Sequence, residues 1–145
     1  MLEHPAIAAL LPHDGAMVLI DQVVDYTEQT IHCRSRIAAL EHHPLAVDGT
    51  LAAVALVEYA AQAMAVHGGL LAPHNHAPRP GRLVALGQLH LAIDRIIEPL
   101  LLDICANRLS GDDSGQVYTF TITAAAQTLA SGQATVMFVD GNDRN

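Results

Sequence analysis

The sequence predicts an α+β fold in which an antiparallel sheet wraps around one buried helix. The segment Thr50–His67 is apolar at nearly every position, as expected for a helix that is buried on all sides. Two strand-like runs precede this segment and four follow it. The chain has 145 residues, which suits a single core, so we expect residues 1–145 to form one domain.

The N-terminal part predicts a short helix followed by a hairpin. Residues 5–11 begin with proline, which suits a first helical turn, and Pro12 should end that helix. Residues 17–26 and 29–37 are rich in β-branched side chains and partly alternate in polarity, which is typical of strands. The short break at residues 27–28 should be the turn between them.

The central helix is expected to begin at Thr50, after the capping cluster at residues 48–50, and to stop at Gly68-Gly69. Its many alanines would let strands approach closely on several sides. Turns are expected at residues 98–99, 111–115 and 131–132, and the four later strands at residues 83–95, 100–109, 116–128 and 133–139.

The net charge of the chain restricts the kinds of partner that it can bind. Fifteen acidic residues stand against seven arginines and no lysine, for a net charge of −8. Non-specific nucleic-acid binding needs cations that displace counterions, so we expect no nucleic-acid partner. An anionic ligand would have to meet a local pair of arginines, such as Arg79 with Arg82 or Arg34 with Arg36.

Cysteine usage and hydropathy predict a cytoplasmic protein. Cys33 and Cys105 are too few and too far apart for a disulfide framework, so we expect two reduced thiols. The N-terminus lacks the basic region of a signal peptide. The longest apolar stretch, Leu51–Val66, is shorter than the roughly 20 residues that cross a bilayer. We expect no membrane association, and since no standard ligand spacing occurs, no metal.

Glu58 is the first candidate for chemistry, because it lies in the middle of a helix whose other positions are mostly apolar. A carboxylate is costly to bury, so Glu is rarely found in a core unless it is paired or functional. Gln62 follows four residues later on the same face and can hydrogen-bond it. Apolar surroundings favour the protonated carboxyl, which suits a general acid. The alternative is that Glu58 and Gln62 mark a narrow solvated stripe.

The nine histidines supply candidates for a base. His42 and His43 precede the helix, within reach of its N-terminal half, so they are the better ones. Backbone amides around Gly49–Leu51, at the expected helix start, could bind the oxygen of a polarised carbonyl. We expect His67, at the other helix end, to act as a cation on the helix dipole. His32 should serve cross-strand packing.

Three segments, taken in chain order, resemble one known family. LLPHDGAMVLIDQVVDY (10–26) is similar to an LPHR-x-P-hydrophobic-DRV opening, ALVEYAAQAMAVHGG (55–69) to a central-helix L-x-L-E-A-M-A-Q-A segment, and TLASGQATVMFVD (128–140) to G-x-x-x-x-E-A-x-x-M last strands. These motifs belong to the hotdog-fold 3-hydroxyacyl-[acyl-carrier-protein] dehydratases of fatty acid synthesis.

The resemblance implies a six-stranded antiparallel sheet around the helix, and a dimer with an acyl tunnel at its interface. It places Glu58 on the family's catalytic carboxylate and Gln62 on its accompanying glutamine. In that chemistry a histidine removes the α-proton of a 3-hydroxyacyl thioester while the carboxyl protonates the departing hydroxyl. The product is a trans-2-enoyl thioester, and no cofactor is needed beyond the pantetheine arm of the substrate.

The family's G-H-F-P-G loop, which carries the base, has no counterpart here, although His43 could substitute from a slightly earlier position. HPLAVDGTLAAVALVEYAAQ (43–62) is similar, without gaps, to the N-P-F-F-D-G-x-x-x-P-A-W-x-x-I-E-Y-M-A-Q segment of short hotdog proteins from aryl-polyene and type II polyketide pathways. Those proteins resemble dehydratase subunits that pair with a second, His-bearing hotdog chain. The resemblance therefore implies that Glu58 is donated to a composite site.

We expect a 3-hydroxyacyl-thioester dehydratase, or a subunit of one, acting on an acyl thioester of acyl carrier protein or CoA. The chain should form a homodimer, or a heterodimer with a second hotdog subunit. A hotdog acyl thioesterase and a non-catalytic acyl-binding subunit are the alternatives. The predicted site residues are the catalytic Glu58 and His43 and the substrate-binding His13, Gly49, Thr50 and Gln62.

Overall fold

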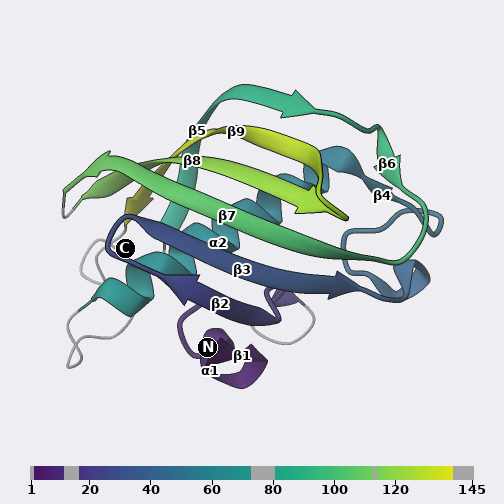
Figure 1. Ribbon diagram of the computed structural model, residues 1–145, viewed down its shortest axis with the longest axis horizontal. Coiled ribbons are helices and arrows are strands. Elements are labelled where there is room, and N and C mark those ends of the chain that lie inside the picture. The colour runs from purple at the N-terminus through teal and green to yellow at the C-terminus, as the bar shows by residue number, and fades with distance from the viewer. Residues whose placement is uncertain (1, 12–16, 73–80, 113, 139–145) are drawn as a thin grey trace, which may run out of the picture.

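One long helix and a curved antiparallel sheet make up the computed structural model (Figure 1). The structure describes residues 2–11, 17–72, 81–112 and 114–138. The elements in chain order are β1 (Leu2–Glu3), α1 (His4–Ala8), β2 (Gln22–Tyr26), β3 (Thr30–Ile37), η2 (Leu40–His42), β4 (Leu51–Ala52), η3 (Ala53–Ala55), α2 (Leu56–Leu71), β5 (Gly81–Leu91), β6 (Arg95–Ile96), β7 (Leu100–Gly111), β8 (Gly115–Ala124) and β9 (Gln127–Phe138).

The sheet has the strand order β1-β2-β3-β7-β8-β9-β5, and β4 pairs separately with β6. This confirms the predicted α+β architecture, with β2 and β3 as the two expected strands before the long helix and β5, β7, β8 and β9 as the four expected strands after it. The sheet has seven strands instead of six, because the two-residue β1 joins the edge beside β2. β2 and β5 are shorter than the runs 17–26 and 83–95 from which they were predicted.

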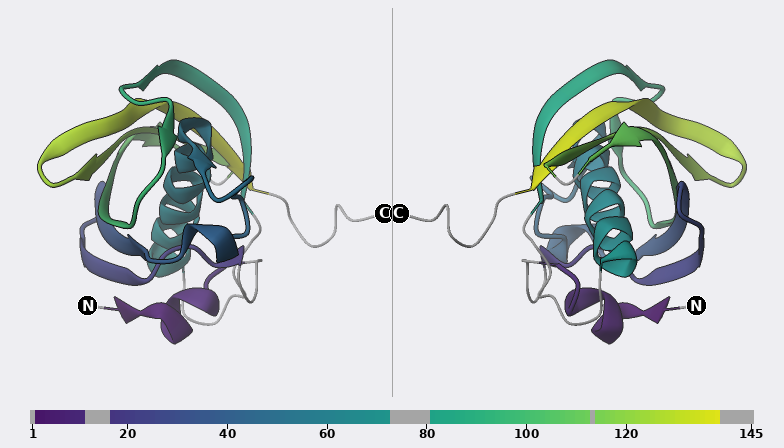
Figure 2. Two further views of the ribbon diagram at one scale, coloured as in Figure 1. Left: turned by 90° about the vertical axis from the view of Figure 1, so that its right-hand side faces the viewer. Right: turned by 90° about the vertical axis from the view of Figure 1, so that its left-hand side faces the viewer.

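The sheet curls over α2, so that the helix lies inside an arch of strands in both side views (Figure 2). α2 packs against β3, β7, β8 and β9. Side chains on the inner face of these strands, such as Ile104 and Ile122, are fully buried against it. Each contributes about 1.5–3 kcal/mol to folding. The stretch Ala53–Leu71 has the length and apolarity of a membrane-spanning helix, but half of it is buried inside the protein, as in a core helix.

The central helix begins at Leu56, so the prediction of a start at Thr50 is wrong. Residues 47–50 form a tight turn in which Asp48 and Gly49 have positive φ values of 53° and 74°. The chain then forms β4, which hydrogen-bonds to β6, and the single turn of η3. A distant segment therefore takes the backbone groups that would have started the helix.

The helix also continues through Gly68 and Gly69, where a stop was predicted, and ends at Leu71. A Cβ atom on Gly69 would lie 3.3 Å from the side chain of Leu10. This glycine therefore permits close approach of the N-terminal segment to the helix and does not terminate it.

The last hairpin turns at Ala125 and Ala126, which both have positive φ, 50° and 65°. The predicted turn at Ser131-Gly132 is wrong, because both residues lie inside β9. A Cβ atom on Gly132 would come within 3.0 Å of the ring of Phe120 on the paired strand. Gly132 thus makes room for an aromatic ring.

β5 is the edge of the sheet farthest from β1, and its apolar side chains are poorly covered. Val84 is 52% exposed, and Leu86 and Leu91 are each 38% exposed. Its outer backbone edge pairs with no strand among the described residues. β5 is thus a long, apolar, open edge, the kind of edge that proteins normally cover or pair.

Candidate functional site

Glu58 lies in the first turn of α2, half-buried, and Gln62 holds it from the next turn. The Gln62 side chain is only 1% exposed. Its Nε2 donates to Glu58 Oε1 (3.3 Å) and to the Met17 carbonyl oxygen (2.6 Å), while its Oε1 accepts the Leu19 N–H (2.8 Å). The expected bond between Glu58 and Gln62 is confirmed. Gln62 therefore ties the carboxylate to the segment that leads into β2.

His43 makes two hydrogen bonds through its ring. Nδ1 lies 3.1 Å from the backbone nitrogen of Leu45 and accepts its N–H. Nε2 lies 2.8 Å from the hydroxyl oxygen of Tyr59. Because Nδ1 must be unprotonated to accept, the neutral ring carries its proton on Nε2 and donates it to Tyr59.

Burial strengthens this assignment. Desolvation lowers the pKa of His43, so the neutral ring is favoured. The partner Tyr59 is 2% exposed, and burial together with the nearby charge of Asp21 raises the pKa of its hydroxyl. The pair is therefore a contact between two neutral groups.

The structure brings Glu58 together with Gln62, whereas the hydrogen bonds of the His43 side chain run to Tyr59 and to its own loop. Consecutive helix positions point about 100° apart, so Glu58 and Tyr59 face different sides of α2. The expectation that His43 acts as a base stays a prediction.

Gly49 and Thr50 lie in the turn that precedes β4 and not in the first turn of α2. The Thr50 N–H and hydroxyl both bond to the Val47 carbonyl oxygen, at 3.0 Å and 3.1 Å. The Thr50 amide is thus already used, and the premise that these amides start the helix does not hold. His13 lies outside the described residues.

His67 forms a second histidine–tyrosine pair, which the sequence did not reveal. Its ring is 0% exposed. Nδ1 lies 2.7 Å from the Tyr118 hydroxyl, and Nε2 donates to the Thr27 carbonyl oxygen at 2.8 Å. Burial lowers the pKa of His67 and raises that of Tyr118 to about 12. The expectation of a cation at the helix end is therefore wrong.

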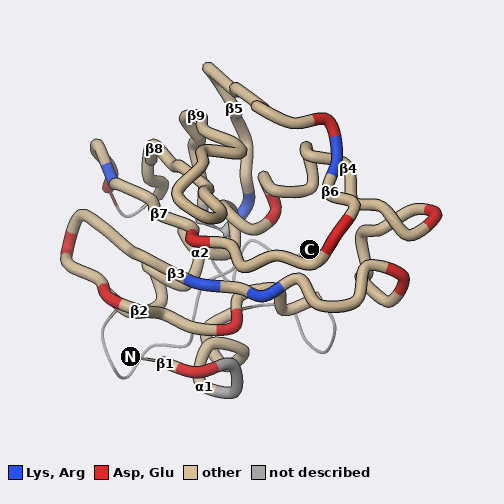
Figure 3. Tube along the Cα trace, turned by 45° about the vertical axis from the view of Figure 1, so that its right-hand side comes forward, with Lys and Arg blue, Asp and Glu red and all other residues tan. Residues whose placement is uncertain are grey.

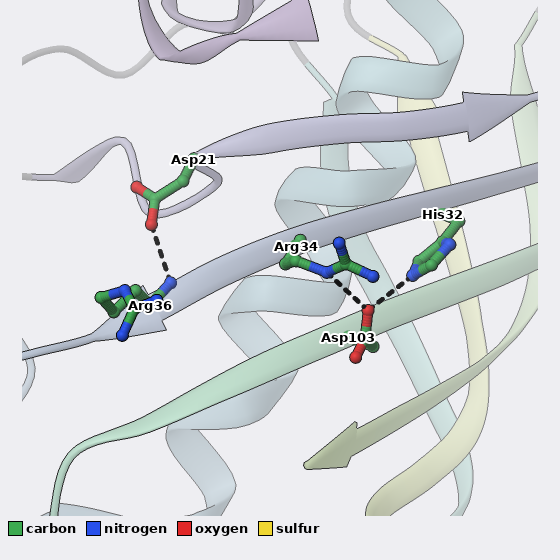
Figure 4. A network of polar contacts seen from close by, with 5 residues as sticks. All are labelled: Asp21, His32, Arg34, Arg36 and Asp103. Carbon is green, nitrogen blue, oxygen red and sulfur yellow. Dashed lines mark hydrogen bonds and ion pairs between the residues drawn. The ribbon is translucent and has the colours of Figure 1, made fainter. Parts of the chain in front are cut away.

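A further polar cluster occupies the outer face of the sheet, away from the helix (Figure 4). The Asp103 carboxylate accepts hydrogen bonds from His32 Nε2 (2.7 Å) and Arg34 Nε (3.0 Å). The bond from His32 is the main reason that the pKa of Asp103 is lowered. His32 thus serves cross-strand contact, as predicted. A shallow hollow of about 240 Å³ opens on this face beside His32 and Cys105.

Charged residues are scattered over several elements, and acidic residues outnumber basic ones (Figure 3). In the expected pair Arg34 and Arg36, Asp103 neutralises the first. In the other pair, Arg82 is exposed on β5 and Arg79 lies outside the described residues. Across the described ranges, no three His, Cys, Asp or Glu side chains gather as metal ligands would.

Comparison with known proteins places the chain in a family. A family model described as ApeP-like, ApeP dehydratase, matches residues 5–144. Among solved structures, the dehydratase heterocomplex ApeI:P from Xenorhabdus doucetiae aligns with a TM-score of 0.83 at 23% identity, covering 94% of this chain and 93% of that one.

Other similar structures share the fold at lower identity. A thioesterase from Haemophilus influenzae aligns with a TM-score of 0.60 at 12% identity, covering 83% of this chain and 78% of the other. A thioesterase from Staphylococcus aureus aligns with a TM-score of 0.63 at 11% identity, covering 82% and 93%. The search of curated proteins gave no match. The match over nearly the whole chain shows that this protein belongs to the ApeP-like dehydratase family.

Proposed function

We propose that this chain is one subunit of a hotdog dehydratase that eliminates water from a 3-hydroxyacyl thioester. Glu58 is the general acid of this reaction. The observation that carries the proposal is a half-buried carboxylate, oriented by Gln62 on the core helix of an ApeP-like dehydratase fold. A positioned acid of this kind contributes about 10²–10⁴-fold to a rate.

The proposed step removes one proton and one hydroxyl. A base takes the proton from the α-carbon, and the released electron pair forms the double bond between the α- and β-carbons. The bond from the β-carbon to oxygen breaks as Glu58 gives its proton to the departing hydroxyl. Water and a 2-enoyl thioester leave, and the base returns its proton to Glu58 through solvent. No redox partner or metal takes part in this balance.

The open strand β5 supports assembly with a second hotdog subunit. It exposes Val84 and Leu86, and its outer backbone edge pairs with no strand in the described part of the chain, so it offers a long strand for pairing. The hollow beside His32 and Cys105 lies on the outer face of the sheet and does not include Glu58. A partner on β5 would enclose the inner side of the sheet and complete the site. The similar X. doucetiae structure is itself a heterocomplex.

Membership of the ApeP-like dehydratase family supports a proposal for the substrate class. We propose a 3-hydroxyacyl chain carried as a thioester on acyl carrier protein or CoA, in aryl-polyene or related fatty acid and polyketide-type synthesis in the cytoplasm. Thioester hydrolysis is the second candidate, because solved thioesterases share this fold with TM-scores of 0.60 and 0.63.

The test measures water elimination from 3-hydroxyacyl thioesters by the chain alone and with a candidate hotdog partner. We expect enoyl product with the partner, and a loss of about 10²–10⁴-fold in Glu58→Gln. Glu41→Gln, which removes an exposed carboxylate from η2, is the matched control and should stay active.

The same assay separates the alternatives. Release of free thiol without enoyl product would identify a thioesterase. Tight binding of an acyl thioester with unchanged turnover in Glu58→Gln would assign catalysis to the partner and leave this chain a binding subunit. A single 15.4 kDa species in light scattering, even with the partner present, would contradict assembly.

A further inference from the structure

We infer that His43 is a positioning residue of the dehydratase site, which locks the loop before α2 onto Tyr59 and so fixes the helix turn that carries Glu58. This inference rests on the proposed function. It assigns the proton-abstracting base to the partner subunit.

The ring of His43 has no lone pair free for proton abstraction. The lone pair of Nδ1 accepts the Leu45 N–H at 3.1 Å, and the Nε2 proton points to the Tyr59 hydroxyl at 2.8 Å. A base for the α-carbon needs an unprotonated nitrogen facing the substrate. His43 would have to break its bond to Leu45 or exchange tautomers before it could act.

The backbone of His43 is equally engaged. Its N–H donates to the Leu40 carbonyl oxygen and its own carbonyl oxygen accepts the Ala46 N–H, each at 3.1 Å. Pro44 follows it and favours the extended conformation that His43 adopts, with φ −71° and ψ 131°. Four hydrogen bonds thus meet at one residue, and they set the course of the chain from Leu40 to Ala46.

Tyr59 connects this loop to the helix. It follows Glu58 directly in the first turn of α2, and its side chain is 2% exposed. Its hydroxyl bonds to His43, while Gln62, in the next turn, bonds to the Met17 carbonyl oxygen and the Leu19 N–H as well as to Glu58. The contacts of Tyr59 with His43 and of Gln62 with residues 17–19 tie the start of α2 to two separate segments and so restrain its rotation about the helix axis. Loss of the His43 contact should therefore misplace Glu58 without removing it.

Two amide substitutions separate positioning from base catalysis, because neither amide can take a proton at neutral pH. In His43→Gln the longer side chain can bring its NH₂ group to the place of Nε2 and keep the bond to Tyr59. In His43→Asn the oxygen can replace Nδ1 as acceptor for Leu45, but the contact with Tyr59 is lost.

Assayed with the partner subunit, His43→Gln should keep turnover within about 3-fold of the parent, while His43→Asn and Tyr59→Phe should each lose about 5–10-fold in kcat, the loss expected when one hydrogen bond is removed. The limbs of the pH–rate profile should stay in place in all three variants. KM should change little, since the contact does not touch substrate.

A loss of about 10³-fold or more in both amide variants, with unchanged thermal unfolding, would make His43 the base and overturn the inference. In that case Glu58→Gln would still be inactive, so the proposed function would survive. Nitrogen NMR of the His43 ring supplies a readout that needs no turnover. We expect the neutral tautomer protonated at Nε2, both in the chain alone and with the partner, and protonation at Nδ1 would contradict the inference.

Discussion

The helix α2 carries a histidine–tyrosine pair at each end, and the two pairs differ in how completely the chain encloses them. At the C-terminal end His67 and Tyr118 are 0% and 1% exposed. One ring nitrogen of His67 bonds to the Tyr118 hydroxyl, and the other donates to the Thr27 carbonyl oxygen. At the N-terminal end Tyr59 is buried, but His43 is only half-buried and belongs to a loop.

One pair is completely buried within the chain, whereas the other is left partly exposed. The pair at His67 joins the helix to β8 and to the turn between β2 and β3, so every polar atom is satisfied within one chain. The pair at His43 joins a loop to Tyr59, which follows Glu58 directly in α2. The same two residue types therefore stabilise the core at one end of the helix, and under the proposed function they position the acid at the other.

The largest contrast should appear in stability. His67→Ala leaves the Tyr118 hydroxyl and the Thr27 carbonyl oxygen unsatisfied beside a new cavity, so we expect a loss of about 3–5 kcal/mol in the free energy of unfolding. His43→Ala removes a half-exposed ring and should cost about 1 kcal/mol. Urea unfolding of the two variants measures both values. Equal losses would remove the distinction between the two ends.

Acidic pH should lower the free energy of unfolding through the buried His67–Tyr118 pair. Burial lowers the pKa of His67 from 6.5, so the unfolded chain binds a proton there at a pH where the folded chain does not. The stability from neutral His67 is therefore fully present above about pH 6.5 and decreases as the pH falls below that value. His43 shifts in the same direction. Asp103, whose pKa is lowered from 3.8, adds its own loss only in more acidic solution.

The free energy of unfolding, measured from pH 7.5 to 5, tests this expectation. His67→Gln cannot titrate, so its stability should depend less on pH over this range than that of the parent. His43→Gln should flatten the profile less, because that ring is partly solvated. A parent profile that does not fall below pH 6.5 would contradict the neutral assignment of His67.

The smallest effect is expected far from both pairs, at the hairpin turn of β8 and β9. Ala125 and Ala126 both adopt positive φ, which costs an L-residue with a Cβ atom. Ala126→Gly should therefore stabilise the fold by about 0.5–1 kcal/mol and leave turnover unchanged. Thermal unfolding measures this gain, and a destabilised variant would show that the turn gains from its Cβ atoms.

Much of the candidate site followed from the helix pattern. Glu58 stands out because a carboxylate interrupts an apolar helix, and its bond to Gln62 follows from the spacing of four residues. The partner of Tyr59 was not predictable in the same way. His43 lies 16 residues away, and no periodicity connects a loop residue to a helix position.

The order of the main strands around the central helix, the burial of that helix and its acidic position were determined by the sequence alone, because polarity at periods of about 2 and 3.6 residues decides which segments can be strands or buried helices. The start of α2 at Leu56, the turn at Ala125-Ala126 and the neutral state of His67 were decided by tertiary structure. Each depends on a group distant in sequence that pairs with the backbone, packs against it or hydrogen-bonds to the ring. β4 pairs with β6 instead of starting the helix, the Phe120 ring fills the space that Gly132 leaves, and the Thr27 carbonyl oxygen accepts a hydrogen bond from Nε2 of His67. Local patterns do not record such long-range choices.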